Sequence, residues 1–195
     1  MKSDIILAGV GGQGILTIAT ILGAAALKDN LYLKQAEVHG MSQRGGDVQS
    51  NLRISSNPIY SDLIPYGSAD LIVSLEPMEA LRYVPYLSDK GWVVTNTNPF
   101  VNIDNYPDMK EVESELESCG NVVAFNMDET AKSLMSPRSS NMVLLGAASP
   151  FIDIKVEEIE SAIANLFAKK GEKIVNSNIE AFRAGRKYTD NLIKS

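Results

Sequence analysis

The chain has 195 residues and a formal net charge of −6, because 24 Asp and Glu outnumber 18 Lys and Arg. This balance argues against a nucleic-acid groove, which needs clustered Lys and Arg, and against a polybasic patch for a membrane surface. One cysteine, Cys119, and one histidine, His39, are too few for an intrachain disulfide, a four-thiolate iron–sulfur cluster or a histidine-based metal site. The length suits a single domain over residues 1–195.

The N-terminal residues lack the layout of a signal peptide, because an apolar strand pattern begins directly after Ser3. The longest apolar stretch, residues 15–27, is too short to span a bilayer and contains two threonines. These features predict a protein of the reducing cytoplasm with no membrane contact.

The first predicted elements are a strand and a helix joined by a glycine turn. The apolar run from Ile5 to Ala8 predicts a buried strand, and residues 15–25 predict a helix. Between them, Gly9, Gly11 and Gly14 fit the pattern G-x-G-x-x-G, with Gly12 as an additional glycine. A strand, a glycine turn and a helix in this order are the context in which the pattern indicates a phosphate site.

The middle of the chain continues the alternation of strands and helices. Residues 31–38 and 48–55 predict two strands, which a glycine-flanked loop separates. Residues 69–75 predict another strand, a helix runs from Pro77 to Leu87, and residues 92–95 predict the next strand after Gly91. Proline is favourable at the first position of a helix, so Pro77 supports that helix start.

The C-terminal half predicts one strand among several helices. The strand is expected over residues 121–125; the helices are expected over 109–118, 127–135, 141–148, 156–167 with Asp153 as the N-cap, and 173–193. The whole pattern predicts an α/β fold, a three-layer α/β/α sandwich with a mostly parallel, Rossmann-like sheet. Ligands of such sheets bind outside the carboxyl ends of the strands, and we expect both glycine loops to meet there.

The N-terminal glycine cluster is a candidate anion site. Free N–H groups at a helix start, together with the positive end of the helix dipole, favour a phosphate or a carboxylate. The candidate residues are Gly9, Gly11, Gly12, Gln13 and Gly14, together with Arg44 from the second glycine loop. A structural interpretation stays open, in which the glycines serve helix–strand packing and Arg44 pairs with Glu37 or Asp47.

The second glycine loop is a candidate interface. It contains Glu37, His39, Gly40, Met41, Ser42, Gln43, Arg44, Gly45 and Gly46. Glycines let another chain approach the backbone closely, and the mixed polar groups suit a contact that is shielded from solvent. An ordered surface turn with a hydrogen-bonded His39 fits the same residues.

Both loops together resemble the gamma subunit, or gamma domain, of the 2-oxoacid:ferredoxin oxidoreductases. The most specific part is the string from Glu37 to Gly46. The other matching residues are the Gly9–Gly14 turn, Asn141 with Leu145-Gly146, and Asn178 with Ala181-Phe182 and Gly185. Within this family, a separate chain of this length is most similar to the beta subunits of the indolepyruvate-using enzymes.

The resemblance implies a function that is shared with a larger partner. The family decarboxylates a 2-oxoacid on thiamine diphosphate, passes electrons through iron–sulfur clusters to ferredoxin, and leaves an acyl group on coenzyme A. This chain has too few cysteines for a cluster and no evident thiamine-diphosphate motif. The resemblance therefore implies a subunit without its own cofactor or catalytic side chain. A partner would carry thiamine diphosphate, Mg²⁺ and the clusters, and this chain would lie near the coenzyme A or substrate side.

Two other functions remain open from the residues alone. An NAD(P)-dependent enzyme would use Asp29 or Glu37 to hold a ribose, although the string from Gln43 to Gly46 has no place in that scheme. A pure assembly module would use both glycine loops only for close packing, and it would have no anion affinity in the assembled complex.

Overall fold

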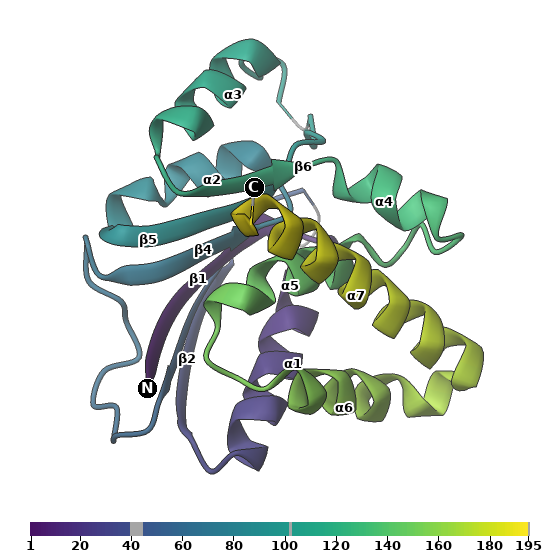
Figure 1. Cartoon of the computed structure of the whole chain (residues 1–195). Helices are drawn as coiled ribbons and strands as arrows, with labels where there is room; N and C mark the ends of the chain where they lie inside the picture. The colour runs from purple at the N-terminus through teal and green to yellow at the C-terminus, as the bar shows by residue number, and fades with distance from the viewer. Residues whose placement is uncertain (40–44, 102, 195) are drawn as a thin grey trace.

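The computed structural model describes residues 1–39, 45–101 and 103–194, and its centre is a six-stranded sheet (Figure 1). The strands are β1 (Lys2–Val10), β2 (Tyr32–His39), β3 (Asp47–Ser55), β4 (Ala69–Ser74), β5 (Leu87–Asn96) and β6 (Val122–Phe125). Their spatial order is β2-β3-β1-β4-β5-β6. Strand β3 pairs antiparallel with β1 and β2, whereas β1, β4, β5 and β6 pair in parallel. Of the described strands only β3 is reversed, so the prediction of a mostly parallel sheet is confirmed.

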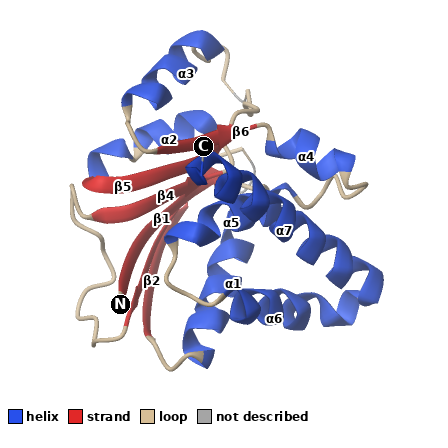
Figure 2. Ribbon diagram, viewed as in Figure 1, coloured by secondary structure: helices blue, strands red, loops and turns tan. Residues whose placement is uncertain are grey.

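Helices cover both faces of this sheet. They are α1 (Ile15–Lys28), α2 (Pro77–Arg82), α3 (Met109–Ser118), α4 (Met127–Ser133), α5 (Ser140–Ala148), α6 (Val156–Phe167) and α7 (Glu172–Lys194), with 3₁₀ turns at Val84–Tyr86, Ser149–Phe151 and Ala168–Lys170. Helices α2 and α3 lie on one face, and α1, α5, α6 and α7 lie on the other (Figure 2). The predicted three-layer α/β/α architecture is therefore confirmed.

The alternation of side chains along β1 explains why two cores form. Ile5 and Leu7 point into the core beneath α1, α5, α6 and α7, whereas Ile6 and Ala8 point into the core beneath α2 and α3. All four side chains have no solvent exposure. A strand that is apolar on both faces needs a helical layer on each side, as parallel sheets generally do.

Helices α5 and α7 approach each other through two glycines. A Cβ atom on Gly146 would lie 1.8 Å from the carbonyl oxygen of Phe182, and one on Gly185 would lie 1.9 Å from that of Val143. Both distances are far below van der Waals contact, so only glycine permits this crossing. Two of the residues that carried the family resemblance therefore serve helix packing.

Two element boundaries differ by several residues from those expected, and one expected helix cap is absent. Helix α2 ends at Arg82 rather than at Leu87, and a 3₁₀ turn follows in which Pro85 has no backbone N–H for a helix. Strand β5 begins at Leu87, so Gly91 lies inside it. A Cβ on Gly91 would lie 2.8 Å from the carbonyl oxygen of Ala69, and this close approach explains the glycine. The expected cap Asp153 is also wrong, because α6 starts after Lys155 without a side-chain cap.

Within the described ranges, every helix is too short or too polar to cross a lipid bilayer.

Candidate functional site

The two glycine loops meet at one edge of the sheet. Strands β1 and β2 run in the same direction, so the segments that follow them lie at the same edge. The Gly11 N–H donates to the Gly46 carbonyl oxygen at 2.8 Å, and the Gly45 N–H approaches the Gly11 carbonyl oxygen at 3.5 Å. The loops are therefore neighbours through backbone contacts, as the strand pattern led us to expect.

The glycines of the first turn have different structural reasons. A Cβ on Gly9 would lie 2.9 Å from Oε1 of Gln13, and one on Gly14 would lie 2.8 Å from Nδ2 of Asn141. Gly12 has a φ of +101°, yet nothing lies within 4 Å of the position of its Cβ. Gly12 thus combines a backbone conformation that favours glycine with an open side, while Gly9 and Gly14 are closed by packing.

Gln13 caps the turn. Its Oε1 accepts a hydrogen bond from the Val10 N–H at 2.7 Å, and its Nε2 donates to the Leu75 carbonyl oxygen at 3.3 Å. The Gln13 N–H itself donates to the Val10 carbonyl oxygen. The side chain therefore ties the end of β1 to the end of β4.

A cavity of about 340 Å³ opens beside this turn. Its lining residues are Gly12, Gln13, Leu75, Asn96, Asp128, Pro137, Arg138, Ser140 and Asn141. They come from the carboxyl ends of β1, β4 and β5, from the start of α4, and from the segment that leads into α5. The chain leaves β1 towards α1 on one face and β4 towards α2 on the other, so this is the point where the topology switches sides. Such a switch point is where open α/β sheets bind ligands.

Two charged residues of opposite sign line the cavity. Arg138 is exposed and makes no hydrogen bond or ion pair with any residue that the structure describes. Asp128 accepts hydrogen bonds from Nδ2 of Asn96 and of Asn98, both at 2.9 Å, and from the Ser140 hydroxyl at 2.5 Å. Burial alone would raise the pKa of Asp128, but these donors outweigh it and hold the pKa below its ordinary value.

A smaller cavity of about 130 Å³ lies beyond the ends of β1 and β4 and is lined by carboxylates. Glu76 caps α2 by accepting from the Glu79 N–H at 2.8 Å, and it also accepts from the Tyr106 hydroxyl. Burial raises the pKa of Glu79, an effect that its ion pair with Arg82 at 2.9 Å opposes. Burial and the bond to Glu76 likewise raise the pKa of Tyr106. Glu76 and Glu79 each have a structural partner, and their bonds explain how α2 starts and how the loop before α3 is anchored.

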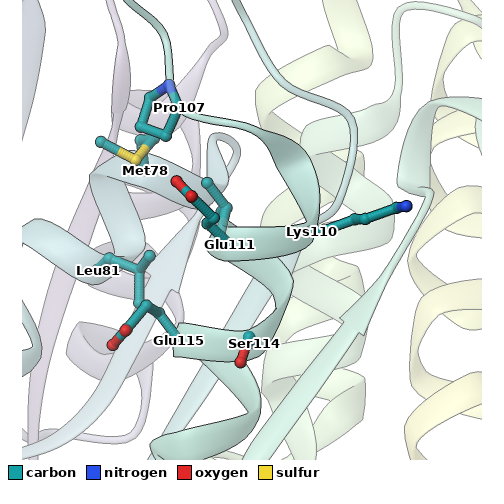
Figure 3. Close-up of a pocket in the computed structure, with 8 residues that line it drawn as sticks. Met78, Leu81, Pro107, Lys110, Glu111, Ser114 and Glu115 are labelled. Carbon is teal, nitrogen blue, oxygen red and sulfur yellow. The ribbon is translucent and has the colours of Figure 1, made fainter.

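A larger hollow of about 560 Å³ lies elsewhere, between α2 and α3 (Figure 3). It is lined by Met78, Leu81, Pro107, Lys110, Glu111, Val112, Ser114 and Glu115. Figure 3 shows the Lys110 side chain turned away from the other labelled side chains. The hollow is an open groove between two helices without convergent polar groups, so volume alone does not mark the functional site.

The second glycine loop is described only at its two ends. Glu37 lies near the end of β2 with an exposed side chain, whose Oε2 accepts from Nε2 of Gln35 at 3.4 Å. Gly45 and Gly46 join the first turn as described above. The candidates Gly40, Met41, Ser42, Gln43 and Arg44 lie outside the described residues, and for His39 only the backbone of β2 is described.

The position of Asp29 argues against its role as the ribose-binding acid of an NAD(P)-dependent enzyme. Asp29 is the C-cap of α1, a helix of 14 residues. It therefore lies about 21 Å from the glycine turn along the helix axis. In the described ranges, His, Cys, Asp and Glu side chains do not form a group that could hold a metal ion.

Sequence reasoning missed Arg138 and Asp128 as lining residues. Both come from the segment around α4 and α5, far in sequence from the glycine turn, and neither lies in a glycine-rich pattern. The available signal was Asn141, whose Nδ2 donates to the Gly14 carbonyl oxygen at 3.3 Å. A polar residue in an otherwise apolar helix marked the contact between α5 and the turn, and its neighbours line the cavity.

The fold and the crevice define a Rossmann-like α/β subunit with a polar cavity at the strand switch point. Residues 4–188 match the family described as pyruvate ferredoxin/flavodoxin oxidoreductase, and the chain belongs to this family.

Individual relatives match along the whole chain. It is 38% identical over 192 residues to the indolepyruvate oxidoreductase subunit IorB of Methanothermobacter thermautotrophicus, which covers 95% of this chain and 96% of that protein. A solved 2-oxoglutarate:ferredoxin oxidoreductase from Magnetococcus marinus, with 2-oxoglutarate, coenzyme A and succinyl-CoA bound, superposes with a TM-score of 0.78 at 26% identity. That match covers 100% of this chain but only 32% of the other. The keto/oxoacid ferredoxin oxidoreductase gamma subunit of Geobacter sulfurreducens has the same fold, with a TM-score of 0.71 at 24% identity over 97% of this chain and 99% of that one.

Proposed function

We propose that this chain is the smaller subunit of a 2-oxoacid:ferredoxin oxidoreductase that acts on indolepyruvate or another aryl pyruvate. The observation that carries this proposal is the 38% identity to an indolepyruvate oxidoreductase subunit across 96% of that protein. The complex would decarboxylate the 2-oxoacid, form an acyl-CoA and pass the electrons to ferredoxin. A cytoplasmic location is part of the proposal.

The cofactors of this reaction belong to the partner in our proposal. A larger subunit would hold thiamine diphosphate with its Mg²⁺ and the iron–sulfur clusters. The support from this chain is its inventory of one cysteine and one histidine, which cannot ligate a cluster. No side chain of this subunit is assigned to catalysis.

Co-purification with a tag on this chain tests the assembly. We expect a stoichiometric complex with one larger subunit that contains iron and thiamine diphosphate and oxidises aryl pyruvates with coenzyme A and ferredoxin. The isolated chain should be colourless and inactive. Stoichiometric iron in the isolated chain, or 2-oxoacid oxidation without a partner, would contradict the proposal.

The segment from Glu37 to Gly46 is proposed as part of the interface with that larger subunit. The backbone contacts of Gly45 and Gly46 with Gly11 support this, because they bring the end of this segment to the same edge of the sheet as the Gly9–Gly14 turn. An obligate contact of this kind buries roughly 2,000 Å² or more.

Arg44→Ala tests the interface. We expect weaker assembly or slower turnover at an unchanged melting temperature. Arg183→Ala is the matched control, because Arg183 is exposed on α7 and pairs only with Glu160 across the surface of the described chain. If the Arg44 variant assembles and turns over as the wild type does, the loop is a surface turn and not part of the interface.

The Gly9–Gly14 turn is proposed to accept a phosphate or carboxylate of coenzyme A in the assembled enzyme. Support comes from Gly12, whose open side faces the cavity. Two donors of the turn are already used, since the N–H groups of Gly11 and Gln13 bond within the protein. Those of Gly12 and Gly14 make no hydrogen bond to the described residues and stay free for an anion.

The Michaelis constant for coenzyme A separates this anion site from pure packing. Gly12→Ala in the reconstituted complex should raise it, while the melting temperature falls only by the cost of backbone strain. A pure assembly module predicts the opposite, a stability loss with unchanged coenzyme A kinetics. An NAD(P)-dependent enzyme predicts retention on an immobilised nicotinamide cofactor.

A further inference from the structure

The groove between α2 and α3 has an apolar floor (Figure 3). Met78 and Leu81 of α2 contribute to it and are only half-buried, while Val112 of α3 lies beneath them in the core. The volume of about 560 Å³ lies within the range of ligand sites, yet polar groups do not converge on it as they do in a small-molecule site. A groove of this kind suits the apolar side chains that another helix presents at every third or fourth position.

The side of the groove that α3 forms carries negative charge. Glu111 and Glu115 line it at a spacing of four residues, so they lie one above the other on the same face of the helix. Both are exposed, and neither carboxylate accepts a hydrogen bond or forms an ion pair within the described part of the chain. Lys110 also lines the groove, but its side chain is turned away from the other labelled ones (Figure 3). The groove therefore presents two carboxylates that no described residue neutralises.

This charge pattern is unfavourable for α3 by itself. Like charges four residues apart repel each other, and Glu113 and Glu117 repeat the pattern on the other side of the helix. The last turn of α3 contains acidic residues and no basic one, although the helix dipole favours cations there. A positively charged partner would relieve both effects. The charges of α3 are therefore complementary to a basic partner.

The groove is continuous with the edge of the sheet where the two glycine loops meet. Strands β4, β5 and β6 run in the same direction as β1, so α2 and α3 both start beside the carboxyl edge and lead away from it. Pro107 lines the groove just before α3 begins. A protein that covers this edge is therefore placed to send one helix along the groove.

We propose that this groove binds an amphipathic helix of the larger subunit, with apolar side chains over the floor and Lys or Arg side chains opposite Glu111 and Glu115. The identity of the partner rests on the proposed function, and the groove extends the interface proposed there to a second part of the fold. A strongly acidic partner would be repelled by the same charges.

A designed peptide tests the groove on the isolated chain. The probe is a fluorescently labelled helix of about 18 residues with leucine along one side and lysine on both flanks, and a second peptide carries glutamate in place of lysine. We expect the lysine peptide to bind and the glutamate peptide not to bind, as measured by fluorescence anisotropy. Added salt should weaken the lysine peptide, because the charges of the groove are exposed to solvent.

Two matched pairs of substitutions locate the contact. Glu111→Lys with Glu115→Lys reverses the charges that line the groove, whereas Glu113→Lys with Glu117→Lys makes the same change on the other side of α3. We expect the first pair to weaken the lysine peptide about tenfold and the second pair no more than about twofold. Ser114→Tyr fills the groove from an exposed position, so it should weaken the peptide without changing the charge. Melting temperatures verify that each variant is folded.

A cross-link tests the partner in the complex that is purified with a tag on this chain. A photoreactive amino acid at Ser114 should react with a segment of the larger subunit in which Lys or Arg residues flank apolar positions at helical spacing. Mass spectrometry identifies that segment. If no larger subunit co-purifies, the proposed function fails and the inference loses its partner. A complex in which position 114 cross-links elsewhere, or not at all, overturns the inference alone.

Three results of the titration would also overturn the inference. Equal losses from both pairs of substitutions would mean that the peptide follows the overall negative charge of the chain. Binding that Ser114→Tyr leaves unchanged would mean that the peptide lies outside the groove. No binding of the lysine peptide at millimolar concentration would mean that the groove does not accept such a helix.

Discussion

The crossing of α5 with α7 and the Gly9–Gly14 turn both depend on glycine, yet for opposite reasons. At the crossing, Gly146 and Gly185 face the backbone of the neighbouring helix at distances that exclude any side chain. In the turn, Gly12 faces open space and is a glycine because of its φ of +101°. Glycines of the same family pattern can therefore have different roles. Some permit close packing of two helices, and another leaves space through which a ligand can approach the backbone.

The largest effect on stability is expected at a glycine whose Cβ position is blocked by the neighbouring helix. Gly146→Ala places a methyl group against the Phe182 carbonyl oxygen, so α5 and α7 have to separate. We expect a loss of about 3 kcal/mol or more in the free energy of unfolding, at or above the upper end of overpacking effects. Gly23→Ala is the control, because its Cβ would meet only the end of Leu33 at 3.2 Å and alanine favours a helix. Urea denaturation of both variants gives the difference, and equal stability would contradict the close crossing.

A smaller effect should separate the glycines within the turn. Gly14→Ala adds a contact with Asn141 to a φ of +84°, whereas Gly12→Ala adds only backbone strain. Strain of this kind costs about 1–2 kcal/mol. We therefore expect Gly14→Ala to lower the melting temperature more than Gly12→Ala, and Gly12→Asn to be milder still because asparagine tolerates this conformation. Calorimetric melting ranks the three variants, and the reverse order would show that Gly12 is closed rather than open.

The smallest effect on stability is expected from the charge of Asp128, which lines the cavity beside the Gly9–Gly14 turn. The pKa of Asp128 is lower in the folded chain than in the unfolded one, so the unfolded state binds the proton more tightly. The stabilisation from its hydrogen bonds is therefore fully present above the unfolded pKa and disappears as the pH falls through the folded pKa. Asp128→Asn should be less stable than wild type at pH 7, and the gap should close at strongly acidic pH. Urea midpoints of the two proteins between pH 3 and pH 7 test this, and a gap independent of pH would refute it.

The sequence predicted the elements well where local chemistry determines them. The glycine turn and α1 could be placed because the apolar strand, the glycines and the helix-forming run follow one another in the chain. It failed at α2, where Pro85 ended the helix early and the chain entered β5 before Gly91. Nothing local at Gly91 reveals the Ala69 carbonyl oxygen that approaches it from a neighbouring strand.

The candidate site was predicted only in part for a similar reason. The turn and its position at the carboxyl edge follow from the strand–helix order, and the contact between Gly11 and Gly46 agrees with that expectation. Arg138 and Asp128 were missed because their role depends on the packing of α5 against the turn. The periodicity of apolar residues shows which side of a helix or strand faces the core. It does not show which elements lie next to each other at an edge of the sheet.

The reversed strand β3 has a consequence for how this edge can change over time. Strand β3 is held in register on both sides, from Val48 opposite His39 and Gly9 to Ser55 opposite Tyr32 and Lys2. Residues added to or removed from the connection between His39 and Asp47 therefore alter the outline of the edge without sliding any strand. The register of β3 is therefore independent of the length of this connection.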